Sequence, residues 1–181
     1  MEPVTFNIDA SDSKLSIRTR ATGMLARLAH DLEISATEFR GHAVRNDEGI
    51  SGELIVPVAG LRVAGQLHGD RLDPAGISNS DRADIERKIR EDVFPGVKEI
   101  HVRGQGTAWN HVDATVETTH GRMPISLSFQ GNENTESVRI LGFTELSLAK
   151  LGVREIKGPL GAFKVKDAVE VLFAITLRPA G

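Results

Sequence analysis

The sequence predicts a mainly antiparallel all-β fold with one inserted α-helix near residues 80–94. Apolar residues recur at every second position through most of the chain, which is typical of strands with one buried and one solvated face. Only one segment shows a four-residue apolar period instead. Clusters of Gly, Asn, Asp and Pro separate the alternating runs, as expected of turns. With 181 residues and no shift in composition along the chain, we expect a single domain, residues 1–181.

The alternating runs begin near the N-terminus and recur as far as residue 129. Each carries apolar side chains two residues apart, with mostly polar or small side chains between them. Short strands at such spacing are typical both of sandwiches and of closed barrels, so the pattern alone leaves the two architectures open. The runs are Val4–Ile8, Leu15–Ile17, Leu32–Ala36, Leu54–Val58, Val112–Val116 and Ile125–Phe129.

The clearest run is the C-terminal one, Phe163–Leu177. Seven of its eight alternate positions are apolar, and Asp167 is the exception. We therefore expect one long strand with a single apolar face. The preceding run changes phase, because Val138 occupies an even position and Phe143 an odd one. A shift of one residue reverses the faces of a strand, so we expect a bulge or bend near Gly142.

The helix is predicted from Ile85, Ile89 and Val93, which recur every four residues. The segment Ser78–Ser80 offers side chains that can cap its N-terminus. The segment Phe94–Gly96, with proline followed by glycine, is expected to end it.

Composition excludes several classes of protein. The chain has 22 Lys and Arg against 25 Asp and Glu, a net charge of −3, and this balance does not favour nucleic-acid binding. It has no cysteine, which excludes disulfides, thiolate metal sites and cysteine catalysis. No run approaches the roughly 20 apolar residues of a membrane span. The segment Met1–Ile8 lacks the features of a signal peptide, so we expect a cytoplasmic protein as written, or a periplasmic one if a signal peptide has been removed.

The most noticeable polar pair is His30-Asp31. Such a pair can ligate a metal or act as acid and base. It leads directly into an alternating run, however, so we favour a histidine held by hydrogen bonds at the start of a strand. The other histidines show no metal-site spacing and no HExxH motif occurs, so we expect neither a metal nor a cofactor. The segment Gly158–Lys164 lacks the phosphate-loop spacing and is predicted to be a turn.

Several motifs occur in an order that resembles a known family. Phe6-Asn7-Ile8-Asp9 with Ser13, and Leu25-Ala26-Arg27-Leu28-Ala29-His30-Asp31, are similar to its N-terminal motifs. The helix followed by the segment Phe94–Ile100, and the hairpin from Val112 to Phe129, are similar to its central region. The C-terminal motifs are Leu151-Gly152-Val153, Lys157-Gly158-Pro159-Leu160-Gly161 and Val165-Lys166-Asp167-Ala168-Val169. On these motifs the chain resembles the YceI-like family of lipocalin-like barrels, proteins associated with polyisoprenoid and other lipid binding.

The resemblance implies an eight-stranded lipocalin-like antiparallel β-barrel whose apolar interior binds a polyisoprenoid or fatty chain without catalysis. The low aromatic content, 4%, permits a hollow interior, since aliphatic side chains leave more room than rings. A polar ligand head could be met near one rim by Arg20, Arg27 or His30. The candidate ligand-binding residues are Ile17, Met24, Leu25, Leu28, His30, Ile125, Leu127, Phe129, Phe143, Phe163, Val165, Val171 and Phe173.

Two other functions remain open from the sequence. One is a hydrolase or isomerase that uses His30 and Asp31. The other is a structural barrel with a filled core that acts through its surface or as a homodimer.

Overall fold

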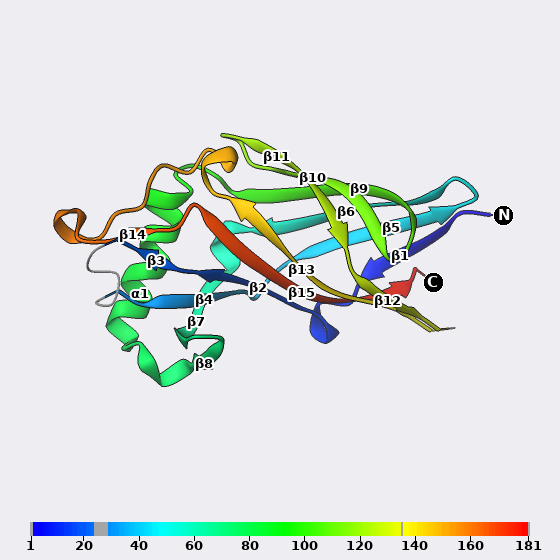
Figure 1. The fold of residues 1–181 in the computed structure, drawn as a ribbon. Coiled ribbons are helices and arrows are strands. Elements are labelled where there is room, and N and C mark those ends of the chain that lie inside the picture. Colours follow the sequence, from blue (N-terminus) through cyan, green and yellow to red (C-terminus); the bar gives the residue numbers. More distant parts are fainter. Residues whose placement is uncertain (1, 24–28, 135, 181) are drawn as a thin grey trace.

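The computed structural model describes residues 2–23, 29–134 and 136–180. It confirms a mainly antiparallel β fold with one inserted helical segment. Figure 1 shows an elongated molecule, with the helix at one end and both chain termini at the other. We refer to these as the helix end and the terminal end. No helix among the described residues is long and apolar enough to cross a membrane.

Within the described residues, eight long strands follow one another around a barrel, and every hydrogen-bonded pair is antiparallel. Three of these strands are bent, and a break of three to five residues divides each of them into two segments. A fourth is divided at a single residue. The strands are β1 (Val4–Ile8) with β2 (Lys14–Thr19), β4 (Asp31–Ala36) with β5 (Arg40–Asn46), β6 (Gly49–Pro57) with β7 (Leu61–His68), β9 (Glu99–Ala108), β10 (His111–Glu117), β11 (Arg122–Ser128) with β12 (Gln130–Glu133), β13 (Val138–Ser147) and β15 (Ala168–Pro179).

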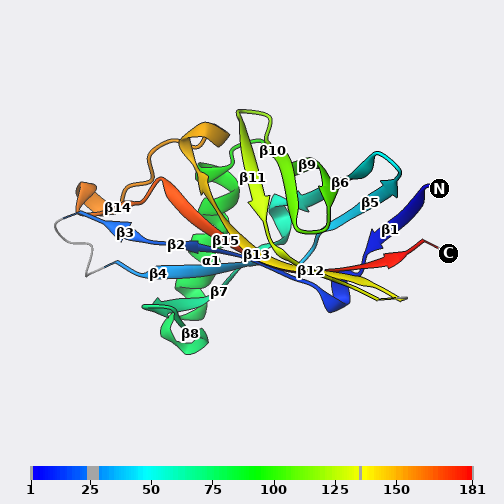
Figure 2. The same ribbon diagram turned by 45° about the vertical axis from the view of Figure 1, so that its right-hand side comes forward.

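The sheet closes at the terminal end only. β15 pairs with β13 on one edge, and with β2 and β1 on the other. β12 follows β11 after Phe129 and pairs with β13, so the ring of hydrogen-bonded strands is complete there. No ladder joins β11 to β13 within the part of the chain that the structure describes. These two strands diverge toward the helix end, and we call the gap between them the seam (Figures 1 and 2).

The helix occupies the predicted place. α1 (Asn79–Lys88) begins after Ser78, whose hydroxyl accepts a hydrogen bond from the Asp81 N–H at 3.1 Å. A wider turn, Ile89–Val93, continues it to Phe94. Two side chains of α1 fix it to β7, because Glu86 accepts the N–H of Val63 at 3.0 Å and Arg82 donates to the carbonyl of the same residue.

The helix end of the barrel is filled by apolar side chains. Residues of the helical segment, of the turn after it and of the bends in the long strands belong to one buried cluster. Among them are Val58, Ile89, Phe94 and Val97, each no more than 8% exposed. We call these four residues the packed cluster.

The predicted C-terminal strand is wrong in its first part. The chain leaves the strand at Asp167, whose carboxylate accepts hydrogen bonds from the Ser147 hydroxyl at 2.6 Å and the Ala149 N–H at 2.7 Å. These two bonds, the hydroxyl first, hold the pKa of Asp167 below its usual value. The residues before this turn form the short β14 (Lys164–Val165), which pairs with β3 (Ala21–Thr22) in a separate two-stranded sheet.

The predicted bulge near Gly142 is also wrong. The ladder between β13 and β15 runs without interruption from Val138 to Ser147. The even positions of β13 therefore face inward throughout, and Gly142 is one of them. A Cβ on Gly142 would lie 2.8 Å from the Phe173 ring and 2.9 Å from the Phe129 Cβ. The glycine leaves room for these two rings, which meet edge to face at 6.1 Å, and the apolar Phe143 points outward.

Candidate functional site

The barrel encloses a cavity of about 230 Å³ with an almost entirely apolar lining. Ligand pockets commonly measure about 300–1,000 Å³, so this one suits a slim ligand. Its lining extends along β15 from Val171 to Leu177, which is about 20 Å at roughly 3.3 Å per residue. The shape follows the strand direction and is elongated.

A row of small residues crosses four neighbouring strands on the inner face of the barrel. Ala43 pairs with Gly52, Gly52 with Gly104, and Gly104 with Ala114. All four residues line the cavity, and we call them the small-residue row. None of these side chains is larger than a methyl group. The volume between this row and the opposite wall of the barrel is therefore not filled by side chains. A Cβ on Gly104 would come within 2.5 Å of Val112, so the strands also pack closely at this row.

The wall on either side of the seam is partly open to solvent. The inward side chains of β11, Ile125 and Leu127, are only partly buried. So are Thr144 and Leu146, their counterparts on β13. On the opposite wall Ile50 and Val56 are buried. The seam is therefore the side of the barrel on which the cavity lining is accessible.

The charged side chains in the middle of the cavity strands lie on the outer face, whereas Arg45, near the end of β5, shares the inner face with Ala43. Glu53 contacts the cavity but lies between the inward residues Gly52 and Leu54, and its carboxylate lies 2.8 Å from Arg103, which is 59% exposed. A hydrogen bond with His101 and the charge of Arg103 hold the pKa of Glu53 below its usual value. This arrangement leaves the hydroxyl of Thr144 as the polar group that β13 directs inward.

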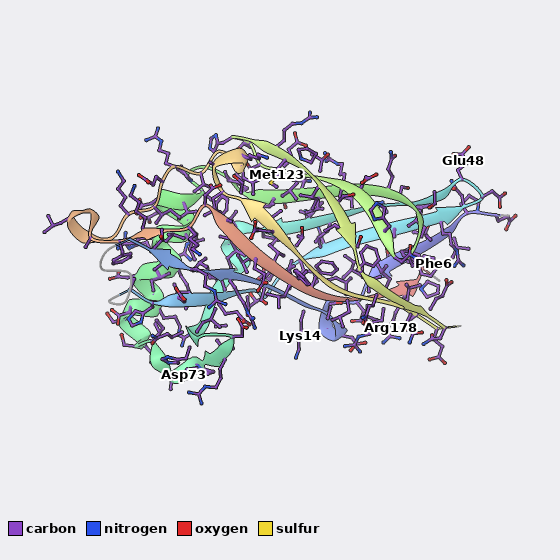
Figure 3. The ribbon with its side chains drawn as sticks, viewed as in Figure 1. Phe6, Lys14, Glu48, Asp73, Met123 and Arg178 are labelled. Carbon is purple, nitrogen blue, oxygen red and sulfur yellow. The ribbon has the colours of Figure 1, made fainter. Side chains whose placement is uncertain are left out.

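The terminal end of the cavity is closed by aromatic residues. The ring of Trp109, in the turn between β9 and β10, packs edge to face on Phe6 at 5.6 Å. The Arg45 guanidinium covers Phe6 at 5.6 Å from the ring centre and pairs with Glu133 on β12. Figure 3 places Phe6 near the two termini and Met123 toward the helix end. The sequence analysis missed Trp109, although its being the one tryptophan of the chain is a usable signal.

The structure brings six of the thirteen predicted site residues to the cavity. They belong to β2, β11, the junction after β11, and β15, and their contact with a ligand stays a prediction. The six are Ile17, Ile125, Leu127, Phe129, Val171 and Phe173.

Four predicted residues lie elsewhere. Phe143 is 68% exposed, because Gly142 and Thr144 take the inward positions on β13. Phe163 and Val165 precede the turn at Asp167 and are absent from the lining, and His30 is exposed. The expected place of Phe143, Phe163 and Val165 in the interior is therefore corrected, and His30, expected near one rim, does not line the cavity. Met24, Leu25 and Leu28 fall outside the described residues.

The side chains of His30 and Asp31 are not joined by a hydrogen bond in the described structure. Asp31 instead accepts the Ala21 N–H at 2.8 Å and lies 3.4 Å from Arg20. Arg20 also contacts Asp70 at 2.8 Å, so Asp31, Arg20 and Asp70 form a surface network away from the cavity lining. Within the described ranges, no group of three or more His, Asp and Glu side chains could hold a metal ion.

Comparison with known proteins identifies the fold. No family model and no curated protein matches the sequence. Among solved structures, the chain is similar to the crystal structure of Burkholderia cenocepacia BcnA, with a TM-score of 0.65. The similarity covers 93% of this chain and 98% of that one, at 13% sequence identity. BcnA is a YceI-like protein, so the likeness supports a YceI-like fold for this chain.

Proposed function

We propose that this protein binds an elongated apolar ligand, a polyisoprenoid or fatty chain, inside the barrel and performs no catalysis on it. The observation that carries the proposal is the apolar cavity along the small-residue row. Its length follows the strands, and its wall is partly accessible at the seam. The fold shared with BcnA is consistent with a binding barrel.

The energetics favour binding of moderate strength. An apolar chain that buries about 400 Å² gains about 10 kcal/mol at roughly 25 cal/mol per Å². Lost freedom on association costs about 4–15 kcal/mol and offsets much of this gain. We therefore expect dissociation constants of about 1 μM or weaker in the absence of polar contacts.

The two rival functions have less support. A filled structural barrel does not fit the space along the small-residue row. A hydrolase built on His30 and Asp31 needs the two side chains to act together on a substrate, whereas Asp31 is bound to Arg20 and the backbone of Ala21.

The proposal is tested first by extraction. Protein purified without added lipid is denatured in organic solvent, and the extract is examined by mass spectrometry. We expect one or more long-chain apolar compounds in amounts comparable to the protein. Delipidated protein is then titrated with a fluorescent fatty-chain probe.

A pair of adjacent substitutions locates the binding site. Leu127→Trp places a larger apolar side chain in the cavity, and we expect it to weaken probe binding about tenfold because the volume is reduced. Ser128→Trp adds the same side chain on the exposed outer face of β11 and should leave affinity unchanged. Thermal melts of both variants check that they fold. Equal probe affinity of folded Leu127→Trp and the wild type would exclude this cavity, and absence of probe binding by the wild type would refute the function.

A further inference from the structure

Trp109 carries a buried hydrogen-bond donor that no protein group uses. Its Nε1 is shielded from solvent and, among the residues that the structure describes, it is the one buried side-chain nitrogen or oxygen without a hydrogen-bond partner. The indole N–H can only donate. Buried donors in folded proteins nearly always find an acceptor, so this atom requires an explanation.

The position of Trp109 points to an acceptor from within the cavity. The residue lines the cavity at its terminal end. Its ring is fixed against Phe6, and Arg45, which pairs with Glu133, also lies over the Phe6 ring. These contacts separate the indole from solvent at that end of the barrel, while the cavity leads to it from the seam.

The chemistry of the lining selects an uncharged acceptor. No lysine or arginine lines the cavity within the described ranges. Arg45 at this end is already paired with Glu133. A carboxylate or phosphate brought to Trp109 would therefore lose its hydration without meeting an unpaired opposite charge, which is strongly unfavourable. A carbonyl oxygen of a ketone, aldehyde or ester can accept the indole N–H at a much smaller desolvation cost.

We propose that Trp109 Nε1 donates a hydrogen bond to an uncharged carbonyl oxygen at the buried end of the apolar ligand. The inference rests on the proposed function and specifies the chemical class of the ligand. It places the polar group of the ligand at the terminal end, whereas the sequence analysis placed it near Arg20, Arg27 and His30.

The test compares three ten-carbon probes: 2-decanone, decane and decanoate. Each is titrated into delipidated full-length protein labelled with ¹⁵N. The chain has a single tryptophan, so one indole N–H signal reports on Trp109 without assignment of the remaining spectrum. We expect 2-decanone to bind about tenfold more tightly than decane, the effect of one buried hydrogen bond. We also expect the indole proton to move downfield with 2-decanone and not with decane.

Trp109→Phe removes the donor and keeps an aromatic ring against Phe6. In this variant 2-decanone and decane should bind with equal affinity, and a thermal melt confirms folding. If the variant does not fold, the indole shift of the wild type still decides the matter.

The possible results separate the two proposals. If the wild type binds 2-decanone and decane equally, with the same indole shift, the hydrogen bond from Trp109 to the ligand is refuted. That result would still support an apolar cavity, and it would indicate that water accepts the indole N–H. Tight binding of decanoate with a downfield indole shift would overturn the choice of an uncharged acceptor. Failure of all three probes to bind would refute the proposed function itself.

Discussion

The two ends of this barrel have similar strands but different interiors. At the helix end the bends of the long strands meet the helical segment, and the packed cluster fills the space. Toward the terminal end β5, β6, β9 and β10 present the small-residue row, and a cavity remains. The contrast shows that alternation determines which side chains point inward, whereas their volume determines whether the interior is filled.

The largest expected effect of a substitution is in the packed cluster. Phe94→Ala removes a ring that is 8% exposed and leaves a void among rigidly held neighbours. We expect the free energy of unfolding to fall by about 3–5 kcal/mol, as measured by urea denaturation. Affinity for the fluorescent probe should remain within about threefold, because Phe94 does not line the cavity. A loss of less than about 1 kcal/mol would show that this end is not tightly packed.

A smaller loss is expected at Gly142, where β13 faces Phe129 and Phe173. A methyl group there would lie within 3.0 Å of both residues, so Gly142→Ala should cost about 1–2 kcal/mol through displaced rings. In an unstrained position the same change commonly stabilises a protein by about 0.4–1 kcal/mol through the unfolded chain. Chemical denaturation gives the change in the free energy of unfolding. A loss of stability would support the described packing of Phe129 and Phe173 against Gly142, and a gain would contradict it.

Leu127→Ala should cost still less. Leu127 is partly buried and faces the cavity, so its removal breaks few contacts and enlarges an existing space. We expect a loss of about 1 kcal/mol or less, compared with the Phe94→Ala variant under the same urea conditions. A loss above about 3 kcal/mol, the range for buried leucines, would mean that the cavity wall is as tightly packed as the helix end.

The smallest effect concerns Asp9, at the bend between β1 and β2. Its carboxylate accepts a hydrogen bond from Arg178 on β15 at 2.7 Å and another from the Ser11 hydroxyl at 2.5 Å. These contacts, that of Arg178 first, lower the pKa of Asp9 from 3.8 to about 2. The ionised form is therefore favoured in the folded state. Its contribution to stability is complete above about pH 4 and is lost as the pH falls toward about 2.

Asp9→Asn should remove this contribution. We expect the wild type to be slightly more stable than the variant at pH 5 and above, and the two denaturation midpoints to converge as the pH falls to about 2. A difference that stays constant from pH 6 to pH 2 would show that the carboxylate charge is not the cause.

The sequence analysis located most strands but, among the long ones, missed β5, β7 and most of β9. On their inner faces β5 and β9 carry Gly41, Ala43, Gly104 and Gly106, so the apolar alternation that reveals other strands is interrupted there. The misplacement of Phe143 has the same cause. Gly142 takes the inward position on β13, whereas a pattern based on apolar residues assigns the inward position to Phe143 instead. The small inward residues that leave room for the cavity are thus the same residues that make these strands difficult to recognise in the sequence.

Alternation, turn residues and helical periodicity by themselves determined the β class, the helix and six cavity residues of this protein, because these signals depend on local spacing. The tertiary structure decided the rest. The small-residue row consists of one residue from each of four strands. The contact of Trp109 with Phe6 joins the turn between β9 and β10 to β1. Such contacts depend on strand register across the barrel, and no local window of sequence contains the residues that make them.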